Sequence, residues 1–218
     1  MSLSKVIKTA LGELGVKEFP AGSNCVKYWS DYTGIGPSMQ GQPWCVCFLW
    51  WCFWKAGESS AFFGGEQTAS CGTLLRWYKE QGLTVPVEDV QPGDIVILNF
   101  HGTQDTEHCG LVVETPVQNG KQVIYTIEGN TSSAGSQSNG GAVCEKTRYP
   151  SQIVAVCRPQ YQPEPVTVDD VTGHWAYKDI QWAKDKGLLR GYADGSMRPD
   201  QPVTRAELAV ILRRLLKE

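Results

Sequence analysis

The chain has 218 residues, enough for one medium-sized domain and a small second one, with the apolar and charged fractions of an ordinary globular protein. The formal net charge is −3 and no strongly basic run is present, which argues against nucleic acid and anionic membranes as partners. No run of about 18 apolar residues exists, so we expect no membrane insertion. The first residues lack the apolar core of a secretory signal, so we expect synthesis in the cytoplasm without a signal peptide.

The first third of the chain has helical periodicity. Apolar residues at helical spacing predict helices over 3–14, 25–32, 42–57 and 67–81. The stretch 42–57 is apolar nearly all round, which predicts a buried helix closed by Gly57. Pro43 suits the first helical position, and Cys45 then falls in the first turn. The free N–H groups and the helix dipole at that end favour a thiolate.

The pattern changes from helices to strands near residue 95. Short apolar runs predict strands over 95–100, 108–114, 122–128, 142–149 and 153–157. Turn residues such as Asn119-Gly120 separate the runs and indicate an antiparallel meander. Helices followed by strands describe an α+β domain, with the N-terminal helices packed on an antiparallel sheet.

The chain divides at a proline-rich segment. Residues 159–166 predict an extended, semi-rigid linker between a domain over 1–158 and a small unit over 167–218. The small unit has helical patterns over 174–186 and from a Thr204/Glu207 capping box to Leu216. We therefore predict a small all-α module after the linker.

Eight cysteines occur without an evident signal peptide, which indicates reduced thiols rather than a disulfide framework. Cys47 and Cys52 are best explained as small core residues. Cys45, Cys47, His108 and Cys109 could supply four zinc ligands, but the pairs have one and zero intervening residues where structural zinc sites usually have two to four. We therefore expect no metal site and no cofactor.

A cysteine hydrolase needs a base for its thiol and a group that orients the base. Of the three histidines, His108 opens an apolar strand, although an ordinary strand-edge histidine is the alternative. Glu128 and Asn130 end the next strand, where an antiparallel neighbour would bring them beside His108. Either could accept a hydrogen bond from the imidazole, Asn130 could instead polarise a substrate carbonyl, and simple turn chemistry could explain both.

Several motifs together resemble the CHAP family, the cysteine, histidine-dependent amidohydrolases/peptidases. They span residues 5–158 and read Pro43-Trp-Cys45-x-x-Phe48, Pro92-Gly-Asp-Ile95, His108-x-Gly-Leu-Val-Val113 and Thr126-Ile-Glu-Gly-Asn130. The resemblance implies a papain-like fold that cuts peptidoglycan, as an N-acetylmuramoyl-L-alanine amidase or as an endopeptidase. It implies Cys45 as nucleophile, His108 as base, Glu128 as orienting acid and Asn130 as a further polar site residue.

The C-terminal unit resembles the S-layer homology family over residues 169–216. The matching motifs are Val171-x-Gly-His-Trp-Ala176, Gly191-Tyr-x-Asp-Gly195 and Val203-Thr-Arg-Ala-Glu207. The resemblance implies binding to a secondary cell-wall polysaccharide, with Arg205 suited to a carboxylate or phosphate unless it is only a first-turn residue. Trp175 is either a core residue or a platform for a sugar. The family usually carries three copies, so a single copy implies weak binding or a homo-trimer of chains.

The combined resemblance implies a peptidoglycan hydrolase anchored to the wall, similar to a phage or prophage endolysin. Such an enzyme would be made in the cytoplasm and would act at the cell wall only after release. Two alternatives stay open from the sequence: a catalytically inactive wall-binding structural protein, and a cysteine protease held at the envelope. The choice between amidase and endopeptidase also stays open, because specificity depends on the shape of the binding groove.

Overall fold

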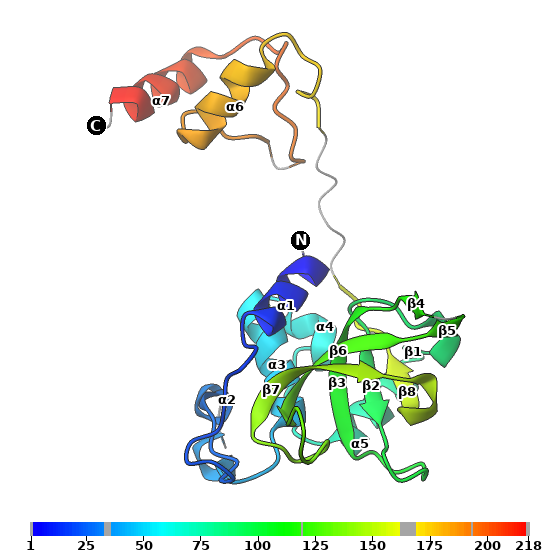
Figure 1. Ribbon diagram of the computed structural model, residues 1–218. Helices are drawn as coiled ribbons and strands as arrows, with labels where there is room; N and C mark the ends of the chain where they lie inside the picture. Colours follow the sequence, from blue (N-terminus) through cyan, green and yellow to red (C-terminus); the bar gives the residue numbers. More distant parts are fainter. Residues whose placement is uncertain (1, 33–35, 119, 162–168, 193, 217–218) are drawn as a thin grey trace. The chain divides into compact units, whose positions relative to one another are not determined.

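The computed structural model describes residues 2–32, 36–118, 120–161, 169–192 and 194–216, which belong to two compact units, Met1–Pro163 and Glu164–Glu218 (Figure 1). Most of the expected linker, residues 162–166, and the expected turn residue Asn119 lie outside the described residues. The first unit combines helices with an antiparallel sheet, so the predicted α+β class is confirmed.

The helices of the first unit surround a buried central one. They are α1 (Ser2–Leu11), α2 (Lys27–Asp31), α3 (Cys45–Ala56), α4 (Ser59–Phe63) and α5 (Cys71–Glu80). Residues 45–53 of α3 are all buried, as its all-round apolar sequence predicts. Gly57 ends α3 with φ of 77°, a left-handed conformation that glycine adopts without strain. The start differs from the prediction: Trp44 is the N-cap, so Pro43 precedes the helix and Cys45 is its first residue.

The main sheet has six strands in the order β1-β8-β2-β3-β6-β7, with antiparallel neighbours throughout. They are β1 (Thr84–Val85), β2 (Ile95–Leu98), β3 (His108–Glu114), β6 (Ile124–Thr131), β7 (Ala142–Arg148) and β8 (Ile153–Cys157). A separate hairpin pairs β4 (Val117–Gln118) with β5 (Lys121–Gln122). The predicted simple meander is wrong in one respect, because β8 returns to lie between β1 and β2.

The sheet is apolar on both faces. On one face Ile95, Ile97 and Leu111 join the large core formed with the helices. On the other face Val96, Leu98 and a few neighbours form a smaller cluster. Successive residues of β2 therefore point to opposite sides, as the strand geometry requires. The helix α3 packs against β3 and β6, so its first turn lies next to the strands that carry the predicted site residues (Figure 1).

The second unit contains α6 (Tyr177–Asp185) and α7 (Arg205–Leu216). The predicted capping box is confirmed: the Thr204 N–H donates to Glu207 Oε2 at 2.8 Å, and the Glu207 N–H donates to Thr204 Oγ1 at 3.1 Å. Neither helix buries a residue completely. The all-α character of this unit stays a prediction. Within the described parts of both units, no helix combines the length and apolar content needed to cross a membrane.

Candidate active site

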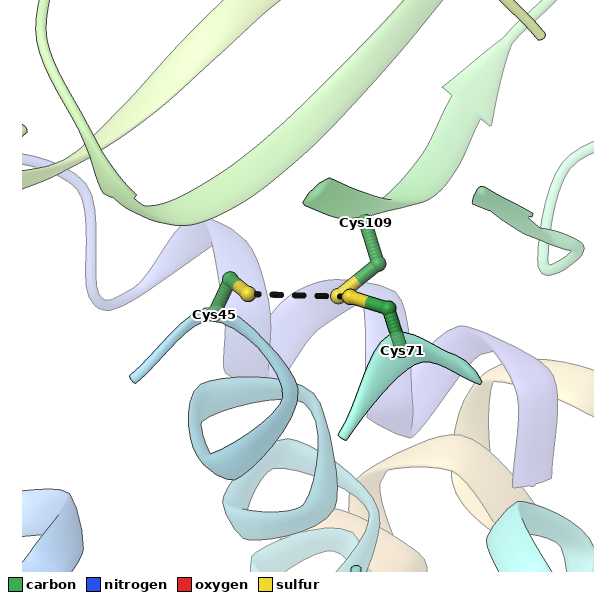
Figure 2. A group of neighbouring side chains, drawn as sticks. All are labelled: Cys45, Cys71 and Cys109. Atoms are coloured by element: carbon green, nitrogen blue, oxygen red, sulfur yellow. Dashed lines mark hydrogen bonds between the residues drawn. The ribbon is translucent and has the colours of Figure 1, made fainter. Parts of the chain in front are cut away.

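Cys45 is the first residue of α3, and only 6% of its surface is exposed. Its Sγ lies 3.9 Å from Sγ of Cys71, and Cys109 points at the same spot from β3 (Figure 2). Hydrogen bonds from the Cys109 and Cys71 thiols, together with His108, lower the pKa of Cys45 well below its usual value, although burial acts in the opposite direction. Cys45 is therefore the thiol of this region that is ready to ionise.

His108 is the first residue of β3 and is completely buried. Its Nε2 lies 3.1 Å from Glu128 Oε2, which leaves Nδ1 as the ring nitrogen for Cys45. Nδ1 has no hydrogen-bond partner among the described residues. Burial lowers the pKa of His108, but contact with Cys45 and Glu128 outweighs it and raises the pKa to about 9. The imidazole is therefore protonated near neutral pH, opposite an ionisable thiol.

Glu128 on β6 is buried and receives three hydrogen bonds besides the contact with His108. The guanidinium of Arg148 donates from Nε to Oε1 at 2.7 Å and from Nη2 to Oε2 at 2.5 Å, and Thr126 Oγ1 donates to Oε1 at 2.6 Å. Burial raises the pKa of Glu128, but Arg148 and His108 together bring it down to about 2. Glu128 is thus a permanent anion that holds His108 in place.

The strand register explains how Glu128 reaches His108. Leu111 pairs with Ile127 in the β3–β6 ladder, so continuing the register places Gly110 opposite Glu128 and His108 diagonally across from it. A Cβ at Gly110 would lie 2.8 Å from Glu128 Cγ, which is closer than side chains tolerate. The glycine therefore provides the space through which the Glu128 side chain extends.

Asn130 occupies a different place from Glu128. Its Oδ1 accepts from the Trp44 N–H at 3.1 Å, and its Nδ2 donates to Asn24 Oδ1 and to the Gly140 carbonyl, both at 2.9 Å. Its hydrogen bonds thus hold the residue before Cys45 and do not go to His108. The structure brings Cys45, His108 and Glu128 together, and places Asn130 at the start of α3, the helix that Cys45 begins.

Other predicted residues have clear positions. Cys47 and Cys52 are buried in α3, where burial raises the pKa of both thiols, so their predicted role as core residues is confirmed. In the second unit Trp175 is 88% exposed, which rules out a core role for its ring. Arg205 is exposed at the start of α7.

Sequence reasoning did not identify three residues that contact Cys45 or Glu128: Arg148, Thr126 and Cys71. Arg148 looks like the polar end of a strand, and only the β6–β7 pairing brings it to Glu128. Cys71 had a usable local signal, because it follows Ser70, whose Oγ accepts from the Thr73 N–H as a helix N-cap. It therefore opens a helix just as Cys45 does.

The whole arrangement supplies the parts of a thiol hydrolase. A buried thiolate lies at a helix N-terminus, a protonated imidazole faces it, and a fixed carboxylate orients the imidazole. The free N–H groups of the first turn of α3 point toward the same end and can stabilise an oxyanion. No part of this chemistry requires a redox group.

Two family models match the chain: the CHAP domain over residues 37–130 and the S-layer homology domain over residues 169–209. Curated relatives include cell surface glycoprotein 1 of Acetivibrio thermocellus, 46% identical over 43 residues, or 20% of this chain and 2% of the relative. Outer membrane protein SlpA of Deinococcus radiodurans is 41% identical over 54 residues, 25% of this chain and 5% of the relative. A cellulosome-anchoring protein of Acetivibrio thermocellus is 40% identical over 48 residues, 22% of this chain and 11% of the relative.

These relatives correct one prediction from the sequence. We expected a cytoplasmic origin without a signal peptide, but the relatives are named a cell surface glycoprotein, an outer membrane protein and a cellulosome-anchoring protein, which contradicts that origin. The expectation rested only on the low apolar content of the first residues, which is a weaker guide than similarity to surface proteins. The chain spans at most 11% of the length of these relatives. In its own organisation, the chain carries a region that matches the CHAP domain model, followed by a region that matches the S-layer homology domain model.

Proposed function

We propose that the first unit hydrolyses an amide bond in the peptide part of peptidoglycan, and that the second unit holds the enzyme at the cell wall. The observation that carries the proposal is the buried chain from Cys45 through His108 to Glu128, inside a unit that matches the CHAP family. A protein that only binds the wall does not need a thiol with a lowered pKa beside a buried carboxylate whose charge is neutralised by an arginine.

The reaction follows from the protonation states. The Cys45 thiolate attacks the amide carbonyl carbon, and the oxyanion that forms is stabilised by N–H groups at the start of α3. The His108 imidazolium gives its proton to the leaving amine, and an acyl-enzyme results. Neutral His108 then takes a proton from water, which attacks the thioester and releases Cys45. Glu128 keeps the ring in one orientation throughout.

The same steps serve either an N-acetylmuramoyl-L-alanine amidase or an endopeptidase, because both cut an amide bond. Mass spectrometry of the released fragments separates them: an amidase frees the glycan from an intact stem peptide, whereas an endopeptidase leaves a shortened peptide attached to it. The endolysin interpretation depended on the cytoplasmic origin that the relatives contradict, so it forms no part of this proposal.

The wall-binding role rests on the S-layer homology match and on two exposed side chains. One relative is named a cellulosome-anchoring protein, which supports an anchoring role here. Arg205 presents a planar guanidinium suited to a carboxylate or phosphate of a secondary wall polysaccharide. Trp175 presents an exposed ring to which a sugar can stack.

Self-association of the second unit is the remaining part of the proposal. The α7 side chains of Leu208, Leu212 and Leu215 share one helical face, and all three are exposed in the single chain. Three chains that pack through this face would form a homo-trimer and multiply weak wall contacts. Light scattering tests this: we expect a trimer mass for the full chain and a monomer mass for Leu212→Asp. A monomer mass for the unaltered chain at working concentration would remove the trimer.

The test of the hydrolase is turbidity loss of purified walls, with the unaltered chain and with Cys45→Ala. Clearing by the unaltered chain alone supports the proposal. Equal clearing by both excludes Cys45 as nucleophile. Retained wall binding without clearing favours a binding protein, and cleavage of a protein substrate but not of walls favours an envelope protease.

A further inference from the structure

Three cysteines from distant parts of the sequence converge at one point. Cys45 begins α3, Cys71 begins α5, and Cys109 is the second residue of β3. Their sulfur atoms all lie within 4.8 Å of one another, and Figure 2 shows the three side chains pointing at a common centre. All three residues are buried: Cys45 and Cys71 keep 6% and 8% of their surface exposed, and Cys109 keeps none. We call these three residues the thiol cluster.

The separation of the sulfurs indicates which chemistry fits. A zinc–thiolate bond is about 2.3 Å long, so two thiolates on one tetrahedral zinc lie about 3.8 Å apart. Sγ of Cys45 and Sγ of Cys71 lie 3.9 Å apart, close to that value. A disulfide needs about 2.05 Å between the sulfurs, which is much shorter than this separation. The Cys45–Cys71 separation thus matches a shared metal ion, and the sulfur of Cys109 lies within 4.8 Å of both.

The elements that carry the cluster place two of its sulfurs at helix N-termini. Cys45 and Cys71 are each the first residue of an α-helix, where unpaired N–H groups and the helix dipole can stabilise the negative charge of a metal-bound thiolate. Without a metal Cys71 keeps its proton: the hydrogen bond with Cys109 lowers the pKa of Cys71, but contact with Cys45 and burial raise it well above its usual value. A cysteine packed only as a small apolar residue needs no such position, and Cys52 in the middle of α3 illustrates that case.

We propose that the thiol cluster binds a thiophilic metal ion of the Zn²⁺ type through the sulfurs of Cys45, Cys71 and Cys109. Cys45 binds as the thiolate, Cys71 and Cys109 each release a proton as their metal–sulfur bonds form, and a water molecule takes the fourth position. No electron is transferred. Because Cys45 is also the proposed nucleophile, a bound ion makes its sulfur unavailable and stops hydrolysis reversibly. This inhibition rests on the proposed function, whereas the binding does not.

Cobalt titration of the reduced full-length chain tests the binding, since tetrahedral cobalt–thiolate centres have charge-transfer and visible absorption bands. We expect one cobalt per chain by native mass spectrometry, displaced by zinc. Cys71→Ser and Cys109→Ser should each weaken the affinity by more than about tenfold. The matched control is Cys144→Ser on β7, a partly exposed cysteine outside the thiol cluster, which should bind as the unaltered chain does. Circular dichroism verifies that each variant is folded.

Two results would overturn the proposal. One is an absence of thiolate–cobalt bands in a folded, fully reduced chain. The other is equal affinity in the unaltered chain and in both cluster variants. Loss of two hydrogen masses on mild oxidation, without any metal uptake by the reduced protein, would replace the metal site by a disulfide. Cobalt uptake by a chain that never clears walls would support the metal site and contradict the proposed hydrolase function. The failure of one proposal can therefore be told from the failure of the other.

Discussion

Arg148 supplies the positive charge that allows the carboxylate of Glu128 to stay ionised although it is buried. It neutralises Glu128 through two hydrogen bonds and is itself almost completely buried. Its guanidinium also lies over the ring of Phe100, with 4.8 Å between the guanidinium carbon and the ring centroid. Arg148 therefore acts on catalysis through Glu128 and His108, as a positioning residue.

We expect Arg148→Ala to lower the free energy of unfolding by about 3 kcal/mol, because it leaves Glu128 buried without a counter-charge. The rate of wall clearing should fall by about tenfold or more, and Arg148→Lys should restore only part of it, since lysine cannot bond both carboxylate oxygens as a planar fork. Thermal unfolding and clearing assays measure the two effects.

Arg158→Ala is the matched control for this change. Arg158 pairs with buried Asp94 at 2.8 Å and 3.0 Å, away from the His108 contacts. The Arg158→Ala substitution should reduce the stability of the protein while the clearing rate of the folded enzyme stays close to normal. An Arg148→Ala enzyme that is folded and clears walls at the full rate would refute the positioning role.

The pH dependence of clearing follows from the same groups. The pKa of His108 is raised to about 9, so the imidazolium is present below that pH and is lost as the pH rises through it. The pKa of Cys45 is lowered, so the thiolate is lost only well on the acidic side. We expect a broad plateau around neutral pH and a decline above about 9, measured with a chelator present. A decline centred near pH 6.5 would show that His108 behaves as an ordinary histidine.

At the scale of elements, the register between β3 and β6 decides whether the site forms. Gly110 opposes Glu128, and the close approach leaves no room for a methyl group. Residue 110 is therefore constrained by the path of another residue's side chain rather than by its own backbone angles.

Gly110→Ala should displace Glu128 from His108, because the new Cβ would lie 2.8 Å from Glu128 Cγ and 3.1 Å from Thr126 Cβ. We expect a loss of about 1–3 kcal/mol in stability from overpacking and a strong drop in clearing rate. Gly12→Ala is the control, since its Cβ would meet only the carbonyls of Lys8 and Thr9 at 3.4 Å. Full clearing activity in Gly110→Ala would show that the Glu128 side chain can reach His108 without the space at residue 110.

Local patterns predicted single elements well and their assembly poorly. The predicted strands over 108–114 and 153–157 have the bounds that the structure gives to β3 and β8, because apolar runs flanked by polar residues mark strands directly. The insertion of β8 between β1 and β2 depends on long-range pairing that no short pattern encodes. For the same reason the sequence pointed to Cys45, His108 and Glu128 but not to Arg148 or to the Cys71 contact.

At the scale of the whole molecule, the proposed hydrolysis and the proposed wall anchoring belong to separate units, so a substitution in one unit should affect only one of them. We expect Trp175→Ala combined with Arg205→Ala to reduce retention on purified walls, because both side chains are exposed and neither supports a core. Hydrolysis of soluble wall fragments should not change, since the Cys45 chain lies in the other unit. Sedimentation with walls and a fragment assay measure the two properties. Equal retention by the double variant would exclude these two residues as the wall contact.

The two side chains that β6 contributes have a consequence for biosynthesis. Glu128 fixes the base, and Asn130 fixes the Trp44 N–H at the start of the nucleophile's helix. A ribosome makes Cys45 and His108 well before it reaches residue 130, so a nascent chain holds the nucleophile and base without the groups that align them. In the proposed mechanism, alignment of the thiol and the imidazole therefore has to wait until β6 has joined the sheet and Arg148 of β7 has paired with Glu128.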